Sequence, residues 1–165
     1  MIEKSLNKIT DIVGSITGIV MLLMMLNVFF DVVARYLFSN SSVGMQEMEW
    51  HLFSVMFLFG IAYALKEEAH VRVDFIYDRL SDKKRAVINI VGTILFLLPF
   101  ALLIVFGSYE YVFDAYDVNE ISEDPGGLTH RWIIKAMIPL SFIFLILSAM
   151  GYILKNVRIY KGEKV

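Results

Sequence analysis

The stretch AVINIVGTILFLLPFALLIVFGSY, residues 86–109, decides the fold because it runs for 24 residues without a charged side chain. A helix rises 1.5 Å per residue and the hydrocarbon core of a bilayer is about 30 Å thick, so about 20 apolar residues are needed to cross it. Pro99 interrupts the stretch, but a membrane helix tolerates proline where neighbouring groups satisfy the carbonyl that it leaves unbonded. The sequence therefore predicts a membrane-spanning helix over residues 86–109.

Residues 12–33 and 133–154 are two further segments with the length and composition of membrane helices. The second contains Pro139, which we expect in the first helical turn, where a missing N–H costs least. The first follows a short segment with two lysines, as the apolar part of a signal peptide would, but it is too long and lacks a small-residue cleavage pattern. We therefore expect an uncleaved helix there.

The remaining helix is the weakest of the four, because residues 51–65 alone are too short to cross a bilayer. Extending the segment back to Met45 restores the length, with Glu47 at the membrane interface and Trp50 as an aromatic anchor. The sequence thus predicts an all-α integral membrane protein with four transmembrane helices in a single domain, residues 1–165. These helices are expected at about 12–33, 45–65, 86–109 and 133–154.

The composition agrees with a membrane protein and excludes several other classes. Hydrophobic residues make up 58% of the chain, against about 45–50% in soluble domains. The formal net charge of −2 is not the basic excess of a nucleic-acid-binding protein, so we expect no nucleic-acid partner. Without cysteine, the chain cannot form a disulfide, a thiolate metal site or an iron–sulfur cluster.

The positions of lysine and arginine predict the orientation in the membrane, since short basic segments stay in the cytoplasm. Of the 15 basic residues, only Arg35, Arg131 and Lys135 lie outside the two termini and the 66–85 segment. We therefore expect both termini and residues 66–85 in the cytoplasm, and the 34–46 and 114–131 loops outside. The second outer loop is acidic and contains the turn Pro125-Gly126-Gly127, so it should have a defined shape.

Polar side chains within the predicted membrane helices are the first candidates for function, because each is costly in hydrocarbon. Asn27, Asp31 and Arg35 share one helix face, and Asp31 precedes Arg35 in the order that favours an ion pair. The face could serve as an ion relay or as a packing site, and we favour packing because the last two helices hold no acid or base deep in the membrane. Glu47 is expected to meet a basic group such as Arg35, holding the first two helices in register.

Three histidines raise the question of a haem or another metal centre. The predicted topology places His51 and His130 at the outer rim and His70 inside, so no pair can hold a haem within the bilayer. The sequence also lacks a glycine-rich phosphate loop, an HExxH zinc motif and a GxSxG nucleophile motif. We therefore expect neither a cofactor nor enzymatic activity.

Short motifs spread over nearly the whole chain are similar to those of one transporter family. They are Arg35-Tyr36, Glu47, Gly60, His70-Val71-Arg72-Val73-Asp74 and Arg79-Leu80-Ser81. On these motifs the chain resembles the small membrane subunit (DctQ-type, or Q subunit) of the tripartite ATP-independent periplasmic (TRAP) transporters. A second set is similar to the branch labelled for mannitol or chloroaromatic compounds, namely Asp124-Pro125-Gly126-Gly127-Leu128, Arg131-Trp132, Lys135 and Ile138-Pro139.

The resemblance implies a multi-pass subunit of a bacterial inner-membrane complex, surrounded by membrane lipids. A separate large permease subunit (M subunit) would carry the organic-anion and Na⁺ sites and move as an elevator, with the small subunit as its fixed scaffold. A periplasmic binding protein (P subunit) would deliver the substrate to the outer face. An alternative of another class is a membrane anchor subunit of a respiratory oxidoreductase, which has a similar size and helix count.

Two groups of residues are candidates for contacts with these partners. The acidic outer loop is the expected docking surface for the binding protein, through Glu120, Glu123 and Asp124. The candidates for structural or subunit-interface roles are Asp31, Arg35, Glu47, Trp50, His70, Arg72, Asp74, Arg131, Trp132 and Lys135.

Overall fold

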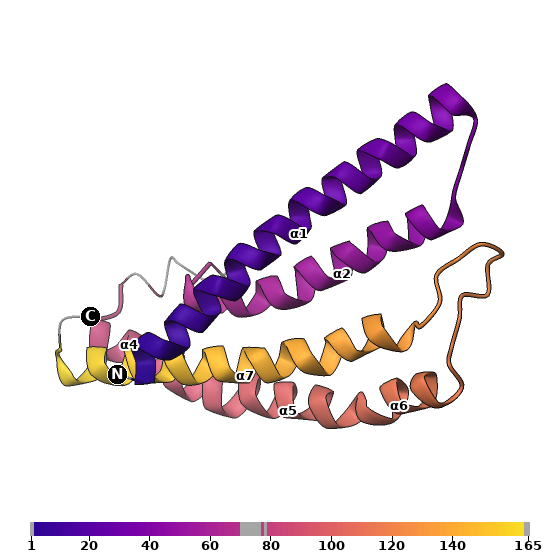
Figure 1. Cartoon of the computed structure of the whole chain (residues 1–165). Helices are drawn as coiled ribbons and strands as arrows, with labels where there is room; N and C mark the ends of the chain where they lie inside the picture. Colours follow the sequence, from indigo (N-terminus) through magenta and orange to yellow (C-terminus); the bar gives the residue numbers. More distant parts are fainter. Residues whose placement is uncertain (1, 70–76, 78, 164–165) are drawn as a thin grey trace.

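The computed structural model describes residues 2–69, 77 and 79–163, and these residues form helices and loops without a strand. The helices are α1 (Ile2–Phe38), α2 (Val43–Lys66), α4 (Asp82–Gly92), the π-helix η1 (Thr93–Leu97), α5 (Leu98–Gly107), α6 (Tyr109–Asp117) and α7 (Trp132–Lys161). The elements from α4 to α6 follow one another almost without a break and form one long helical segment (Figure 1).

Four helical segments are long and apolar enough to cross a membrane, namely α1, α2, residues 82–117 and α7. This confirms the prediction of an all-α protein with four transmembrane helices. Each observed segment includes the expected range and continues past it, and α1 with its 37 residues is about 55 Å long, against a hydrocarbon thickness of about 30 Å. Loops 39–42 and 118–131 form what we call the outer end, following the predicted orientation, and the opposite end is the inner end.

The helix boundaries follow from the local sequence. Ser42 precedes α2 in an extended conformation (φ −116°, ψ 119°), and its Oγ accepts a hydrogen bond from the Met45 N–H at 3.4 Å. An N-cap serine satisfies a backbone donor that has no partner within the helix. Gly162 follows the last residue of α7 with φ of +80°, a left-handed conformation that glycine adopts at little cost.

The two prolines of the membrane helices are accommodated in different ways. Pro99 lies in the first turn of α5 directly after η1, so the backbone changes its hydrogen-bonding pattern where the proline would otherwise disrupt it. The sequence predicts Pro139 in the first turn of the last helix, and this is wrong, because α7 begins at Trp132 and Pro139 lies inside it. The helix starts early because its first turns need not be uncharged: Lys135 lies within α7, where it pairs with Glu120.

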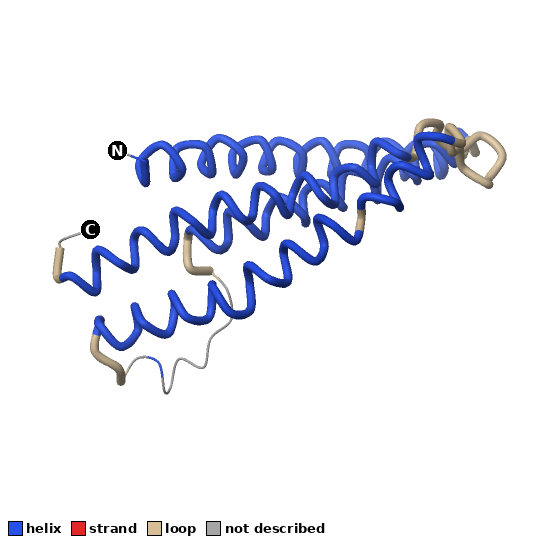
Figure 2. The backbone as a smooth tube through the Cα atoms, turned by 90° about the horizontal axis from the view of Figure 1, so that it is seen from below, coloured by secondary structure: helices blue, strands red, loops and turns tan. Residues whose placement is uncertain are grey.

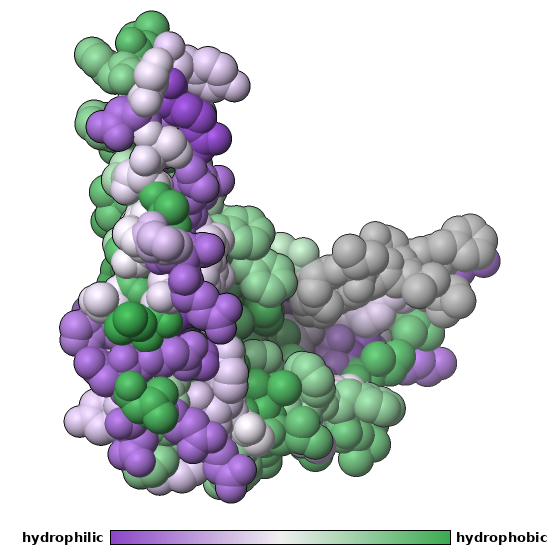
Figure 3. Space-filling model, turned by 90° about the vertical axis from the view of Figure 1, so that its right-hand side faces the viewer, coloured by the Kyte–Doolittle hydropathy of each residue, from purple (hydrophilic) through white to green (hydrophobic). Residues whose placement is uncertain are grey.

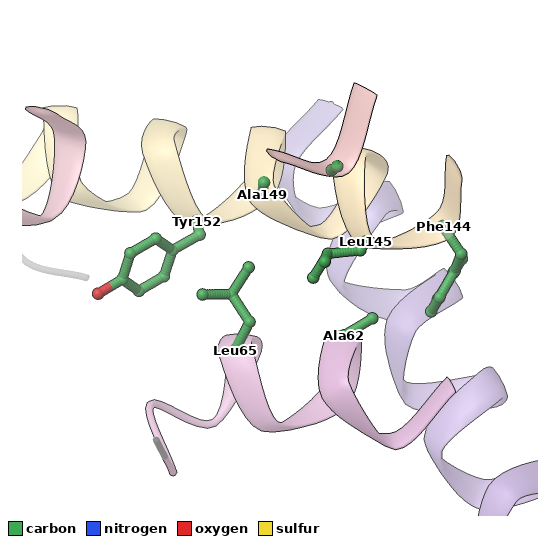
Figure 4. Close-up of a cluster of buried hydrophobic side chains, with 7 residues drawn as sticks. Ala62, Leu65, Phe144, Leu145, Ala149 and Tyr152 are labelled. Atoms are coloured by element: carbon green, nitrogen blue, oxygen red, sulfur yellow. The ribbon is translucent and has the colours of Figure 1, made fainter. Parts of the chain in front are cut away.

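The buried core lies between α2 and α7. Figure 4 shows Ala62 and Leu65 of α2 facing Ala149 and Tyr152 of α7. Both alanines are fully buried, and small residues at such a contact allow two helix backbones to approach closely. The Ser148 hydroxyl of α7 also donates a hydrogen bond to the Ala62 carbonyl at 2.9 Å. These two helices therefore form the centre of the fold.

α1 packs along α2, and one small and one polar residue of α1 show how. Gly14 lies against the ring of Tyr63, and a side chain at position 14 would collide with that ring. Toward the outer end, the Asn27 side-chain amide donates a hydrogen bond to the Met45 carbonyl at 3.0 Å. Figure 1 shows that α1 crosses α7 near its own N-terminus and diverges from α7 toward the outer end. At that end, α1 therefore depends on α2 for its position.

Polar side chains join the helices at the inner end. Arg158 of α7 forms an ion pair with Glu3 of α1 at 3.0 Å. The Asn89 side-chain amide of α4 donates a hydrogen bond to Asn156 Oδ1 of α7 at 2.8 Å. α7 thus holds both the first helix and the start of the 82–117 segment at this end.

The helices form an open arrangement rather than a closed bundle. Figure 2 shows α1 lying apart from the other helices over much of its length in that view, while α4 stays bonded to α7 through Asn89. The space-filling view in Figure 3 shows apolar side chains gathered on the outside of the molecule. Among the exposed apolar side chains are Phe29 of α1 at 68% and Phe96 and Phe106 at 75% each. A surface of this kind favours aggregation in water, whereas lipid or another membrane subunit can cover it.

Candidate functional site

A buried carboxylate anchors the outer loop to α2. Glu47, which lies in the second turn of α2, is 7% exposed. Its Oε1 accepts a hydrogen bond from the Ser122 hydroxyl, and its Oε2 accepts one from the Leu128 N–H at 2.5 Å. Hydrogen bonds to a charged acceptor are roughly twice as strong as neutral ones, so Glu47 fixes both sides of the loop at once.

The turn between Ser122 and Leu128 is shaped to fit this carboxylate. The Ser122 N–H donates to the Leu128 carbonyl at 3.0 Å and closes the turn. Gly127 faces Glu47 so closely that an added Cβ would lie 2.8 Å from Glu47 Oε2 and 2.5 Å from the Ser122 side chain. Gly126 adopts a positive φ of +85°. Gly127 is therefore required by the close approach to Glu47, and Gly126 by its left-handed backbone conformation.

The expected contact between Glu47 and Arg35 is wrong. Arg35 instead pairs with Asp31 one turn earlier on α1, where the i, i+4 spacing keeps the two side chains together. Asp31 is buried in this position, and Asn27 of the same helix face makes the hydrogen bond to α2. The three charged residues do not form one cluster, because the loop supplies the nearest donors to Glu47.

A second cluster holds the other end of the loop to α7. Glu120 pairs with Lys135, and Glu120 Oε1 lies 3.8 Å from Arg131 Nε. The Arg131 N–H also donates to the Glu120 carbonyl at 3.0 Å. The Arg131 guanidinium lies 5.6 Å from the centre of the Trp50 ring, and Lys135 Nζ lies 4.0 Å from the centre of the Tyr111 ring, which are cation–π distances.

The remaining predicted residues occupy different environments. Trp132 packs edge-on against Tyr116, with ring centres 5.3 Å apart, and closes the outer end of α6 against α7. The predicted interface residues His70, Arg72 and Asp74 lie outside the described residues.

The acidic loop is shorter and less uniform than the sequence predicts. Asp114 and Asp117 belong to α6, because that helix continues to residue 117. Glu120 is engaged with two cations of this chain, whereas Glu123 and Asp124 are exposed at the outer end. Of the three predicted docking residues, Glu123 and Asp124 therefore have the exposure expected of that role, and Glu120 does not.

The buried polar side chains of the described residues are hydrogen-bonded within the chain. Within residues 2–69, 77 and 79–163, every buried side-chain nitrogen or oxygen has a hydrogen-bond partner. No group of three acidic, histidine or cysteine residues in that part of the chain could hold a metal ion. His51 and His130, which the sequence places together at the outer rim of the membrane, line one cavity of about 310 Å³ at the outer end.

The fold and this outer cluster define a class of protein, a small four-helix membrane subunit with a shaped loop at one end and an apolar surface left open for lipid or partner helices. Residues 24–159 match the family described as the DctQ component of tripartite ATP-independent periplasmic transporters. The chain therefore belongs to this family: it is a small permease subunit of a TRAP transporter and a multi-pass inner-membrane protein. This assignment favours a transporter subunit over the anchor of an oxidoreductase.

Curated relatives with similar sequences carry names of the same kind. A putative TRAP transporter small permease protein of Haemophilus influenzae is 24% identical over 149 residues, which cover 90% of this chain and 87% of the relative. The ectoine TRAP transporter small permease protein TeaB of Halomonas elongata is 28% identical over 149 residues, covering 90% and 75%. The sialic acid TRAP transporter small permease protein SiaQ of Vibrio cholerae is 30% identical over 107 residues, covering 65% and 60%.

Proposed function

We propose that this chain is the fixed scaffold subunit of a Na⁺-coupled secondary transporter for a small organic anion. In this proposal, a large permease subunit carries the substrate and Na⁺ sites and moves as an elevator. A periplasmic binding protein delivers the anion to the outer end of the two membrane subunits. The small subunit itself is not an enzyme and holds no cofactor.

The observation that carries the scaffold role is how the polar groups of the membrane helices are used. Transport sites near the bilayer midplane need exposed polar ligands, commonly at the ends of broken helices. Here Ser141 and Ser148, in the middle of α7, donate their hydroxyl groups to the Ile138 and Ala62 carbonyls. Side chains bonded in this way support helix packing and leave few groups to coordinate an ion or an anion.

The exposed apolar faces support a partner subunit in the membrane. Phe29 on α1 and Phe96 and Phe106 on the 82–117 segment point away from the α2–α7 core. In a bilayer, helix association depends on close van der Waals packing rather than on hydrophobic burial alone. The exposed apolar faces of α1 and of the 82–117 segment offer surfaces against which a large permease can be held in place.

The outer loop supports a docking role for the binding protein. Glu47 and the Glu120 cluster hold the loop at both ends, and the exposed Glu123 and Asp124 lie between these anchors. Exposed charges mainly set the encounter rate and the register of a complex, within a Debye length of about 8 Å at physiological salt. A preformed acidic loop suits a partly basic surface on the binding protein.

Reconstitution of the transporter tests this division of labour. Proteoliposomes would contain this chain, its large permease or both, with the binding protein outside and a carboxylate that the binding protein is shown to bind. We expect Na⁺-dependent uptake only when both membrane subunits are present, and its loss when Na⁺ is replaced by K⁺. Uptake by vesicles that contain only this chain and the binding protein would contradict the scaffold role.

A further inference from the structure

A cavity of about 280 Å³ lies between α2, α6 and α7 near the outer end. Its sides are mainly apolar and aromatic, while Arg131 and Lys135 line the same cavity. An apolar cavity that also contains two cations differs from an ordinary gap between membrane helices. The apolar residues that the argument uses are Phe53, Phe57, Leu58, Ile134 and Ile138.

The charges at this cavity do not cancel. Arg131 and Lys135 are one helical turn apart, and their side chains are 27% and 14% exposed. Glu120 is the carboxylate that pairs with them, so these three groups carry a net charge of about +1 at neutral pH. Glu47 also acts electrostatically on Arg131, but its oxygens bond Ser122 and Leu128 and not the two cations. An arginine has five N–H donors and a lysine has three, so Glu120 alone cannot satisfy them all. The two cations therefore keep N–H donors that can bind the oxygen atoms of an anionic group such as a phosphate.

The depth and length of the cavity match one leaflet of a membrane. The cations lie at the start of α7, beside Trp50, and tryptophan is enriched at the membrane interface. Residues 50–58 of α2 extend about 12 Å from there toward the midplane, compared with about 15 Å for half of the hydrocarbon core. A second, larger cavity lies toward the inner end, between α2, the 82–117 segment and α7. Phe142 of α7 packs edge-on against Phe100 between the two cavities.

We propose that this cavity binds one anionic phospholipid of the outer leaflet. The phosphate contacts Arg131 and Lys135, and one acyl chain lies between α2 and α7 against Phe57 and Ile138. A partner helix is a poorer fit, because a helix about 10–12 Å wide that continues through the membrane needs far more room than about 280 Å³. The lipid would join α2, α6 and α7 at the outer end and support the Glu120 cluster that holds the loop.

Native mass spectrometry of the full chain in detergent tests the proposal, with dioleoyl phosphatidylglycerol as the probe. We expect one tightly bound lipid per chain, and binding at least about tenfold weaker in the variant Arg131→Gln/Lys135→Gln. The matched control is Lys83→Gln/Lys84→Gln, which removes two exposed cations at the inner end and should bind like the wild type. Inorganic phosphate at millimolar concentration should not displace the lipid, which separates a lipid site from a simple anion site.

A second variant keeps the test independent of the loop, since removing both cations can also disturb Glu120. Ser54→Phe places a ring among the lining residues of the cavity and leaves every charge in place. We expect it to weaken lipid binding by a similar factor without lowering the melting temperature. Wild-type lipid binding by either variant would overturn the proposal, as would displacement of the lipid by inorganic phosphate.

Discussion

Removing the Glu47 carboxylate should release the outer loop from α2. Glu47→Ala leaves the Ser122 hydroxyl and the Leu128 N–H without the acceptor they have in the native structure. A hydrogen bond to a charged group contributes about 1.5–3 kcal/mol, and two such bonds that share one carboxylate are not additive. We therefore expect the free energy of loop opening to fall by about 3 kcal/mol.

Amide hydrogen exchange followed by mass spectrometry measures this opening directly, because the Leu128 N–H is itself a donor to Glu47. A loss of about 3 kcal/mol corresponds to exchange that is about 100-fold faster in the peptide containing Leu128. Glu47→Gln keeps one acceptor oxygen and the shape of the side chain, so its effect should be about tenfold. Peptides from α6 should exchange at the wild-type rate in both variants.

Glu49→Ala is the matched control, because it removes a carboxylate from the same turn of α2 but from a different helix face. Gly127→Ala gives an independent perturbation, since its Cβ would press on both Glu47 and Ser122. It should also accelerate exchange at Leu128. If Glu47→Ala changed loop exchange no more than Glu49→Ala does, the carboxylate anchor would be refuted.

Three further predictions concern orientation, docking and the pair on α1. Thr129→Cys should react with an impermeant thiol reagent in intact cells and Ser81→Cys should not, and the lack of native cysteine makes the labelling specific; labelling at Ser81 from outside would reverse the topology. Glu123→Lys/Asp124→Lys should raise the binding-protein concentration for half-maximal uptake by about three- to tenfold at low salt, with less effect at high salt; the same concentration dependence as wild type would leave the loop without a docking role. Arg35→Ala strands a buried carboxylate one turn earlier and should lower the melting temperature of the purified complex; a stable complex that has lost Na⁺ coupling would instead support an ion relay.

The sequence is sufficient to predict the fold because three of the four membrane helices are long apolar runs, and the fourth reaches spanning length once it is extended back to Met45. Residues 86–109 and 12–33 are long apolar runs, and the physics of the bilayer leaves little choice but a helix. Helix boundaries were harder, since charged residues such as Lys135 can lie inside a helix when a partner is near. That partner, Glu120, lies in a loop whose path depends on the whole fold.

The sequence predicts the candidate site in part: contacts between residues close in the sequence can be read from their spacing, and contacts between distant residues cannot. The ion pair between Asp31 and Arg35 is local, so its spacing revealed it. The predicted contact of Glu47 with Arg35 is wrong because the partners of Glu47 are a serine hydroxyl and a backbone N–H about 80 residues away, which no local spacing reveals. The one available signal was the Pro125-Gly126-Gly127 turn, which indicated a shaped loop but not what it would contact.

The π-helical turn η1 has a consequence for which side chains face α7. In a regular helix each residue turns by about 100°, so Asn89 and Ala101, 12 residues apart, would point about 120° away from each other. Yet Asn89 bonds Asn156 of α7, and Ala101 is fully buried in the core that α7 shares. A single π turn accommodates one extra residue, which brings the two positions to within about 20°. Deleting one residue from 93–97 would therefore restore an ordinary helix without changing that alignment, whereas deleting one from 90–92 or 98–100 would turn one of the two positions away from α7.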